Sequence, residues 1–247
     1  MSATKIEYCD ITINPIVGCS KISEGCANCY AERMAWRLKC MGIKKYQDVV
    51  DRNGWTGKIG IDMSVFDNLP KIPKRIFIGS MGDLFHPNIK DSELNSVFLK
   101  MLWRDWHTYL LLTKRPARMF DFATIGTGWR AKMDHVWLGV TAENQQRADE
   151  RLPILLKIPA FHYWVSAEPL LGPIDLGIDI GHGVGDLAID RLSWVIAGPE
   201  TGPGARACQP EWIEDIYAQT RSAGKSFFDK RKENWLAREF LMMKQES

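Results

Sequence analysis

The chain has 247 residues, of which 45% are hydrophobic and 25% are charged, and its 32 basic and 30 acidic side chains give a formal net charge of +2. Because this composition supplies enough apolar surface for a full core, it argues against a largely disordered protein. The balanced charge argues against a dedicated phosphate-neutralising surface, although a local basic groove stays open.

The first ten residues, MSATKIEYCD, lack the basic start, the apolar run and the cleavage site of a secretory signal. No stretch of the sequence approaches the roughly 18 apolar residues that a membrane span needs. We therefore expect a cytoplasmic protein with no membrane partner. In that reducing compartment, the six cysteines indicate metal ligands or reactive thiols before disulfides.

Strand-like and helix-like segments alternate along the chain. Apolar runs bounded by turn residues predict strands at 6–15, 75–80, 108–114, 135–142, 161–169, 192–198 and 225–231. Helical spacing of apolar residues predicts helices at 30–40, 91–106, 115–122, 143–158 and 209–224. The stretches at about 41–73 and 177–190 lack a clear period or are rich in glycine, and we expect irregular insertions there.

This alternation predicts an α/β fold in which helices cover the outside of a parallel sheet. Six or seven β/α units in one chain indicate a partial (β/α)6-type, TIM-like barrel, formed by a single domain over residues 1–247. In such folds the working residues follow the carboxyl ends of the strands. The candidate residues at these predicted strand ends are Ser80, Asp83, Lys114, Arg115, Thr141, Glu143, Asn144, Glu168, Gly198 and Glu200.

The loop after the first predicted strand, GCSKISEGCANCYAERM at residues 18–34, holds three cysteines. Cys19, Cys26 and Cys29 are separated by six and then two residues, a spacing found both in zinc sites and in iron–sulfur sites. Structural zinc normally takes four protein ligands, whereas this group supplies three. Cys40 would lie roughly 16 Å further along a helix, and Cys9 is expected at the opposite end of the first strand. Incidental buried thiols are a third alternative, but a three-cysteine iron–sulfur site is the preferred interpretation.

Six sequence blocks, in order, carry a resemblance to known proteins. They are INPIVGCSKISEGCANCYAERM, IGSMGDLFHP, LLTKRPARM, VWLGVTAENQQRADERLPILL, VSAEPLLGPIDL and WVIAGPETGPGARACQPEW. The chain resembles a phage- and prophage-associated family of three-cysteine-motif proteins, usually described as uncharacterised phage proteins. It also resembles the radical S-adenosylmethionine (SAM) superfamily, with a variant C-x6-C-x2-C motif. The block GPETG at 198–202 stands where GGESG is expected, so substrate contacts near the C-terminus are expected to differ.

The resemblance implies that Cys19, Cys26 and Cys29 bind a [4Fe–4S] cluster whose fourth iron binds SAM. An electron from a flavodoxin- or ferredoxin-like donor would then cleave SAM to methionine and a 5′-deoxyadenosyl radical. This radical would abstract hydrogen from a substrate, for which a nucleobase or nucleotide in phage-related modification or repair is the implied class.

The resemblance also implies roles for the residues after the second and fourth strands. The segment Ser80-Met81-Gly82-Asp83 would hold the methionine amino group of SAM, with Asp83 as the acceptor. Thr141, Glu143 and Asn144 would contact its ribose or carboxylate. Aspartate also caps turns and helices, and Glu143 is equally compatible with a charge in the first turn of a helix.

The remaining strand ends supply charged residues and a glycine. Lys114 and Arg115 suit a substrate carboxylate or phosphate, or form a solvated pair. Glu168 is at the right strand end to contact SAM or substrate. Gly198 permits close approach of the backbone near Glu200, as the flat adenine ring would require.

Two rival functions stay open. A zinc-stapled nucleic-acid-binding or adaptor protein would use the cysteines without catalysis, and a metal-free barrel enzyme would use Asp83, Glu168 and Lys114 as acid–base groups. Trp36, Trp103, Trp137, Trp164 and Trp194 lie on predicted helices or strands, and we expect core positions for them rather than base-stacking ones.

Overall fold

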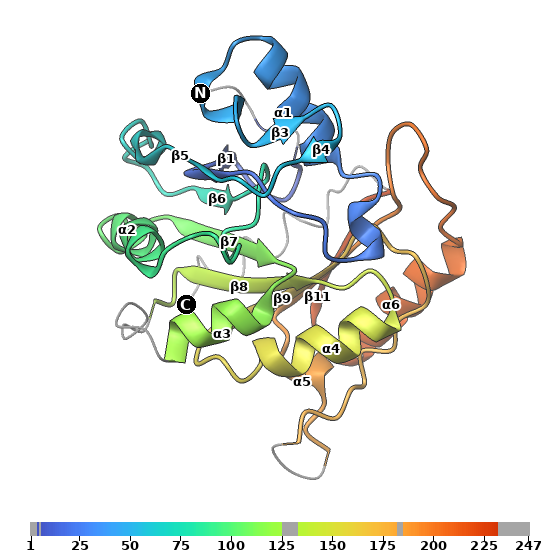
Figure 1. The fold of residues 1–247 in the computed structure, drawn as a ribbon. Coiled ribbons are helices and arrows are strands. Elements are labelled where there is room, and N and C mark those ends of the chain that lie inside the picture. The colour runs from blue at the N-terminus through green and yellow to red at the C-terminus, as the bar shows by residue number, and fades with distance from the viewer. Residues whose placement is uncertain (1–3, 5, 125–132, 182–184, 232–247) are drawn as a thin grey trace.

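A computed structural model describes residues 4, 6–124, 133–181 and 185–231 of the chain. Its centre is one parallel sheet with the strand order β1-β6-β7-β8-β9-β10-β11, which curls into a half-barrel (Figure 1). The strands are β1 (Ile11–Ile13), β6 (Arg75–Ile78), β7 (Thr108–Thr113), β8 (Val136–Thr141), β9 (His162–Ala167), β10 (Trp194–Ala197) and β11 (Ser226–Asp229). The strands of this sheet thus follow one another in the same order as in the chain, as expected for repeated β/α units.

Helices cover the outer face of the half-barrel (Figure 1). They are α1 (Tyr30–Cys40), α2 (Asp91–Leu102), α3 (Pro116–Thr124), α4 (Gln145–Leu155), α5 (Ala188–Arg191) and α6 (Pro210–Ser222). The predicted α/β architecture with a curled parallel sheet and outer helices is confirmed. None of the described helices combines the length and the apolar composition of a membrane-spanning segment.

The two predicted insertions contain more local order than expected. Between α1 and β6, the strands β3 (Val50–Asp51) and β4 (Gly54–Trp55) pair with each other, and β5 (Gly60–Ile61) pairs with β2 (Ile16–Val17). These short elements surround the inner face of α1, where buried Val17, Ala35, Tyr46, Val49, Val50 and Met81 form a small core. In the second insertion, a bridge between Asp179 and Leu187 joins the described residues on either side of 182–184.

Alternate residues of the central strands serve two separate cores. In β7, Tyr109 and Leu111 face the helices and join the large outer core, whereas Leu110 faces the concave side. The concave core is rich in aromatic side chains, namely Tyr8, Phe77, Trp137, Trp164, Trp194 and Phe228. Their edge-to-face and tilted ring contacts lie at centroid distances of 5.6–6.4 Å. This core fills the inside of the half-barrel below the carboxyl ends of the strands.

The predicted core positions are correct for the tryptophans on strands and wrong for one tryptophan at the end of a helix. Trp137, Trp164 and Trp194 are buried, and Trp36 packs partly buried against α1's small core. Trp103, however, is 67% exposed. It caps the C-terminus of α2, where the helix ends and its last side chain is no longer directed at the sheet.

Trp164 should be a main determinant of stability. Its side chain is fully buried, and a Cβ added to Gly139 on the next strand would lie 2.4 Å from its ring, so the backbone is shaped around it. We expect Trp164→Ala to lower the free energy of unfolding by about 3–5 kcal/mol because it leaves a large cavity. Trp103→Ala is the matched control and should change it by less than about 0.5 kcal/mol. Urea unfolding followed by circular dichroism measures both, and equal losses would contradict this account.

Candidate functional site

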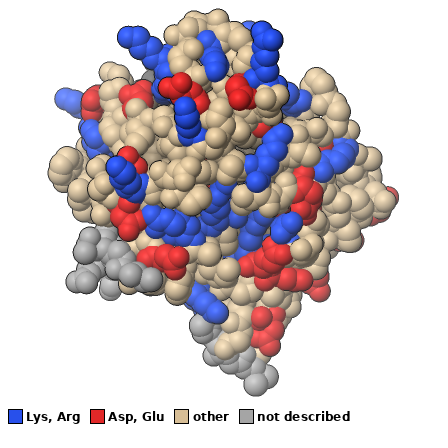
Figure 2. All heavy atoms as spheres, viewed as in Figure 1, with Lys and Arg blue, Asp and Glu red and all other residues tan. Residues whose placement is uncertain are grey.

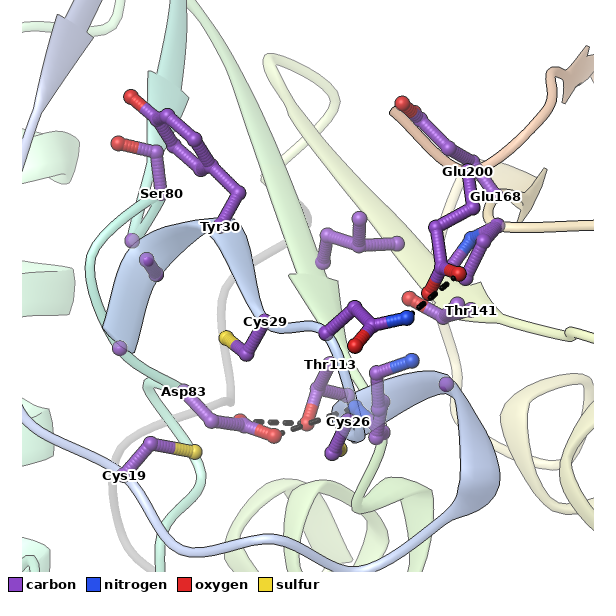
Figure 3. A pocket seen from close by; sticks show the side chains of 18 of the residues that line it. Cys19, Cys26, Cys29, Tyr30, Ser80, Asp83, Thr113, Thr141, Glu168 and Glu200 are labelled. Carbon is purple, nitrogen blue, oxygen red and sulfur yellow. Dashed lines mark hydrogen bonds between the residues drawn. The ribbon is translucent and has the colours of Figure 1, made fainter. Parts of the chain in front are cut away.

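A cavity of about 580 Å³ opens at the carboxyl edge of the sheet (Figure 3). This volume lies in the range that cofactor and substrate sites occupy. Ten of the predicted site residues line it: Cys19, Cys26, Cys29, Ser80, Asp83, Lys114, Arg115, Thr141, Glu168 and Glu200. The structure does not place Glu143, Asn144 or Gly198 in its lining. The cavity therefore collects predicted residues from five different strand ends and from the cysteine loop.

The cysteine loop is fixed to the sheet by a close contact between two glycines. Gly18, directly after β2, pairs with Gly82, beyond the end of β6, in an isolated parallel bridge. Gly18 has a φ of +100°, and a Cβ on it would lie 2.3 Å from the carbonyl oxygen of Lys58, so only glycine fits. This contact brings the turn that carries Ser80 and Asp83 beside the loop that carries Cys19.

All three cysteines of the loop are free thiols that line the cavity. Cys26 ends a short 3-10 helix, and Cys29 is the N-cap of α1. Burial raises the pKa of Cys19 to about 11, with a further increase from Asp83 and an opposing effect of Arg115. The other cysteines, Cys9 and exposed Cys40 among them, are not in the cavity lining.

Asp83 is the centre of one hydrogen-bond network. Its carboxylate accepts from the Thr113 hydroxyl at 2.6 Å, from the Phe85 amide at 3.0 Å and from the Lys114 amide at 3.2 Å. Arg115 Nη1 also donates to it at 2.8 Å. The carboxylate predicted to accept an ammonium group is thus engaged by neighbouring strand ends.

Arg115 connects this network to the cysteine loop. Its Nη2 donates to the carbonyl and hydroxyl oxygens of Ser20, both at 2.9 Å, and its Nη1 lies 3.6 Å from the sulfur of Cys19. His86 Nε2 hydrogen-bonds the same Ser20 hydroxyl at 2.9 Å. Arg115 therefore has protein partners on both sides, and it presents positive charge to a thiol rather than standing as a solvated cation.

Glu143 is the centre of a second network, outside the cavity lining. Its side chain is completely buried and accepts from Ser23 of the cysteine loop at 2.6 Å and from Arg151 of α4 at 2.8 Å. Lys114 forms an ion pair with the same carboxylate. A Cβ on Gly25 would lie 2.4 Å from Glu143 Oε1, so the loop has a glycine where it passes over the carboxylate. Burial opposes ionisation of Glu143, but Lys114 and Arg151 outweigh it and lower its pKa.

Asn144 joins the same loop to α4. It is the N-cap of that helix and accepts from the Arg147 amide at 3.1 Å. Its side-chain amide donates to Glu24, which also forms an ion pair with Arg147 at 2.9 Å. The roles of Glu143 and Asn144 in this structure are to hold the cysteine loop rather than to face the cavity.

Glu200 fastens the loop from the opposite side. It accepts from the side chain of Asn28, next to Cys29, at 2.9 Å. Arg206 donates to it from Nε and Nη2 at 2.9 and 2.6 Å, and these bonds hold the pKa of Glu200 at about 2. Glu168 instead pairs with Lys230, which follows the last strand. In Figure 3, Glu168 lies across the cavity from Cys19 and Asp83.

Sequence reasoning missed several residues of the site. The strand-end rule, applied to the last strand as well, would have found Lys230. No sequence signal distinguishes Tyr8, Ser23, Asn28 or Arg151, because their roles depend on partners that are distant in the chain.

The charged surface near the site is mixed. Figure 2 shows a band of Lys and Arg side chains across the middle of the face in view, with acidic side chains beside it. Arg118 pairs with Asp91, and Arg147 pairs with Glu24 and Glu150, so part of the basic charge is neutralised by neighbours.

Among the residues that the structure describes, no group of three or more His, Cys, Asp or Glu side chains is placed to hold one metal ion. In a tetrahedral zinc site with bonds of about 2.3 Å, two sulfurs approach to within roughly 3.8 Å of each other. The loop cysteines share one cavity without that close grouping.

Removing the buried carboxylate should destabilise the protein strongly. We expect Glu143→Gln to lower the free energy of unfolding by about 3–5 kcal/mol, because two cations lose their buried partner. Glu150→Gln on α4 is the control, since Glu150 pairs at the surface, where an ion pair contributes less than about 1 kcal/mol. Chemical denaturation compares them, and a smaller loss for Glu143→Gln would contradict the network.

The Glu200 contact also predicts a pH dependence. The folded-state pKa of about 2 lies below the usual 4.5, so the carboxylate stabilises the fold above pH 4.5 and this contribution disappears as the pH falls towards 2. We expect the melting temperature of Glu200→Gln to be lower than that of the wild type at pH 7 and to converge with it in acid. Thermal melts from pH 7 to pH 2.5 measure this, and parallel curves would refute the assignment.

Comparison with known proteins identifies the family of the chain. A search of curated proteins and a search of solved structures both find no similar protein. The family described as Protein of unknown function (DUF5131) matches residues 3–247, which include the cysteine loop, all seven strands of the sheet and every residue of the cavity. The chain therefore belongs to this family.

Proposed function

We propose that the protein is a radical SAM enzyme whose loop cysteines hold a [4Fe–4S] cluster. The observation that carries this proposal is that Cys19, Cys26 and Cys29, all free thiols, line one cavity at the carboxyl edge of a parallel half-barrel. This is the edge at which β/α barrels place their chemistry.

The donor set fits a cluster better than a single ion. Three thiols line the cavity, so a four-iron cluster would retain one iron without a protein ligand. Each cluster thiolate binds its own iron, so the sulfurs need not converge as closely as they do around zinc. The absence of a single-ion grouping among the described side chains is compatible with that arrangement, and three thiols lack the fourth protein ligand that structural zinc normally takes.

The cluster would supply the electron that cleaves SAM into methionine and a 5′-deoxyadenosyl radical. The chain's own residues favour the negative charge of bound thiolates in two ways. Arg115 donates towards Cys19, and the N-terminus of the eleven-residue helix α1 begins directly after Cys29. Met34, Trp55, Phe77 and Leu112 give the cavity an apolar lining that keeps water away from a reactive species.

The substrate that we propose is a nucleobase or nucleotide, in a phage-related modification or repair pathway, with a flavodoxin- or ferredoxin-like electron donor. The near-neutral net charge favours a small substrate over a long duplex, because duplex binding depends on neutralised phosphates. Ser80 and Thr141 line the cavity and remain the candidates for polar contacts with SAM, whereas Glu168, also in the lining, is the candidate for a contact with SAM or with the substrate.

The test begins with anaerobic purification and reconstitution, followed by iron and sulfide analysis, a visible spectrum, and addition of dithionite and SAM. We expect about four irons per chain and formation of 5′-deoxyadenosine. Alanine substitution of Cys19, Cys26 or Cys29 should abolish both. Cys40→Ala is the matched control, since Cys40 is exposed at the end of α1 and outside the cavity lining, and it should retain both.

Two results would overturn the proposal. One tightly bound zinc per chain without 5′-deoxyadenosine would identify the loop as a structural staple. Full retention of a measured activity in the three loop variants would instead indicate metal-free chemistry in the barrel.

A further inference from the structure

Glu168, Lys230 and Tyr8 form a separate group in the cavity. They belong neither to the network around Asp83 nor to the network around Glu143. Glu168 follows β9, Lys230 follows β11, and Tyr8 precedes β1 on the concave face. All three line the cavity. They therefore form part of its wall on the side of the last strands, away from the cysteine loop.

The position of Lys230 is fixed by three contacts. Its ammonium group pairs with Glu168 and lies 5.9 Å from the centre of the Tyr8 ring. The stem of its side chain packs on Gly198, where an added Cβ would approach Lys230 Cβ to 2.8 Å. Gly198 thus leaves room for the lysine stem, and the charged end is directed to the cavity wall.

The pair retains hydrogen-bonding capacity. A lysine ammonium has three N–H donors, and a carboxylate has two acceptor oxygens. Among the described residues, only Glu168 Oε1 is bonded to the Lys230 ammonium, and Glu168 Oε2 and the Tyr8 hydroxyl have no hydrogen-bond partner. Both side chains of the pair are about a quarter exposed, at 26% and 25%. A donor and an acceptor therefore stand side by side at the cavity.

Charge and shape limit what this group can bind. The pair is neutral as a whole, so it favours a neutral ligand over an anion that would be repelled by Glu168. Tyr8, Phe77, Leu112 and Ile6 supply apolar wall next to the pair, and the Tyr8 and Phe77 rings meet edge to face at 5.9 Å. A neutral planar ring with an N–H donor beside a carbonyl acceptor matches both the charge of the pair and the apolar wall next to it.

We propose that Glu168 and Lys230 bind the lactam edge of a neutral substrate nucleobase, with Glu168 accepting from the ring N–H and Lys230 donating to the adjacent carbonyl. This assignment rests on the proposed function, since it names the substrate subsite of that enzyme. The adenine ring of SAM also carries a donor beside an acceptor, so the test has to distinguish the cofactor from the substrate as the source of the base.

The test is titration calorimetry of reconstituted full-length protein with uridine and with 3-methyluridine, in which the ring N–H is replaced. We expect uridine to bind and both 3-methylation and Lys230→Met to weaken binding about 10- to 100-fold, since each removes a hydrogen bond to a charged group. Lys100→Met on the outer helix α2, which breaks the ion pair between Lys100 and Asp67, is the matched control and should leave uridine binding unchanged. Glu168→Leu is a second variant with the same expected loss, and thermal melts verify that each variant folds.

The outcomes separate the subsite from the enzyme. No uridine binding, or equal binding to the wild type and folded Lys230→Met, overturns the subsite. Competition between S-adenosylhomocysteine and uridine also overturns it, because the group would then belong to the cofactor. Formation of 5′-deoxyadenosine is measured on the same preparations, so a failure of SAM cleavage with intact, Lys230-dependent uridine binding would reject the radical mechanism while retaining the subsite.

Discussion

The arrangement of the site depends on one buried carboxylate. Glu143 joins Ser23 of the cysteine loop, Lys114 at the end of β7 and Arg151 of α4. A carboxylate with no exposed surface is tolerable only when it is paired and hydrogen-bonded, and its partners are equally dependent on it. The loop that carries the cysteines therefore cannot move away from the sheet without breaking the hydrogen bond that Ser23 donates to this buried carboxylate.

The charged residues of the cavity differ in whether they are already bonded to other side chains. Asp83 and Arg115 bond to each other, and Glu200 bonds to Arg206, so these conspicuous charges mainly hold the loop in place. The Glu168–Lys230 pair is different because, within the part of the chain that the structure describes, it retains unused donors and acceptors on the cavity wall. This contrast separates the residues that build the site from those with capacity to contact a ligand.

The aromatic core explains why the cavity lies at one edge of the half-barrel. Trp137, Trp164, Trp194 and Phe228 fill the concave side below the strand ends, and large rings in contact exclude water and ligands there. The cysteine loop and the residues around Glu200 line the space above them. The cavity is thus bounded by apolar packing below and by polar contacts above.

Much of this could be predicted from local sequence. The limits of α1, the positions of the central strands and the grouping of their ends follow from apolar periodicity and turn residues, which act between near neighbours. Charge pairing could not be predicted in this way. Lys114 and Arg115 looked available for a ligand, but their carboxylate partners are 29 and 32 residues away and meet them only because the intervening units fold side by side. The same holds for Tyr8 and Lys230, which come from the two ends of the described chain and become neighbours only when the sheet curls.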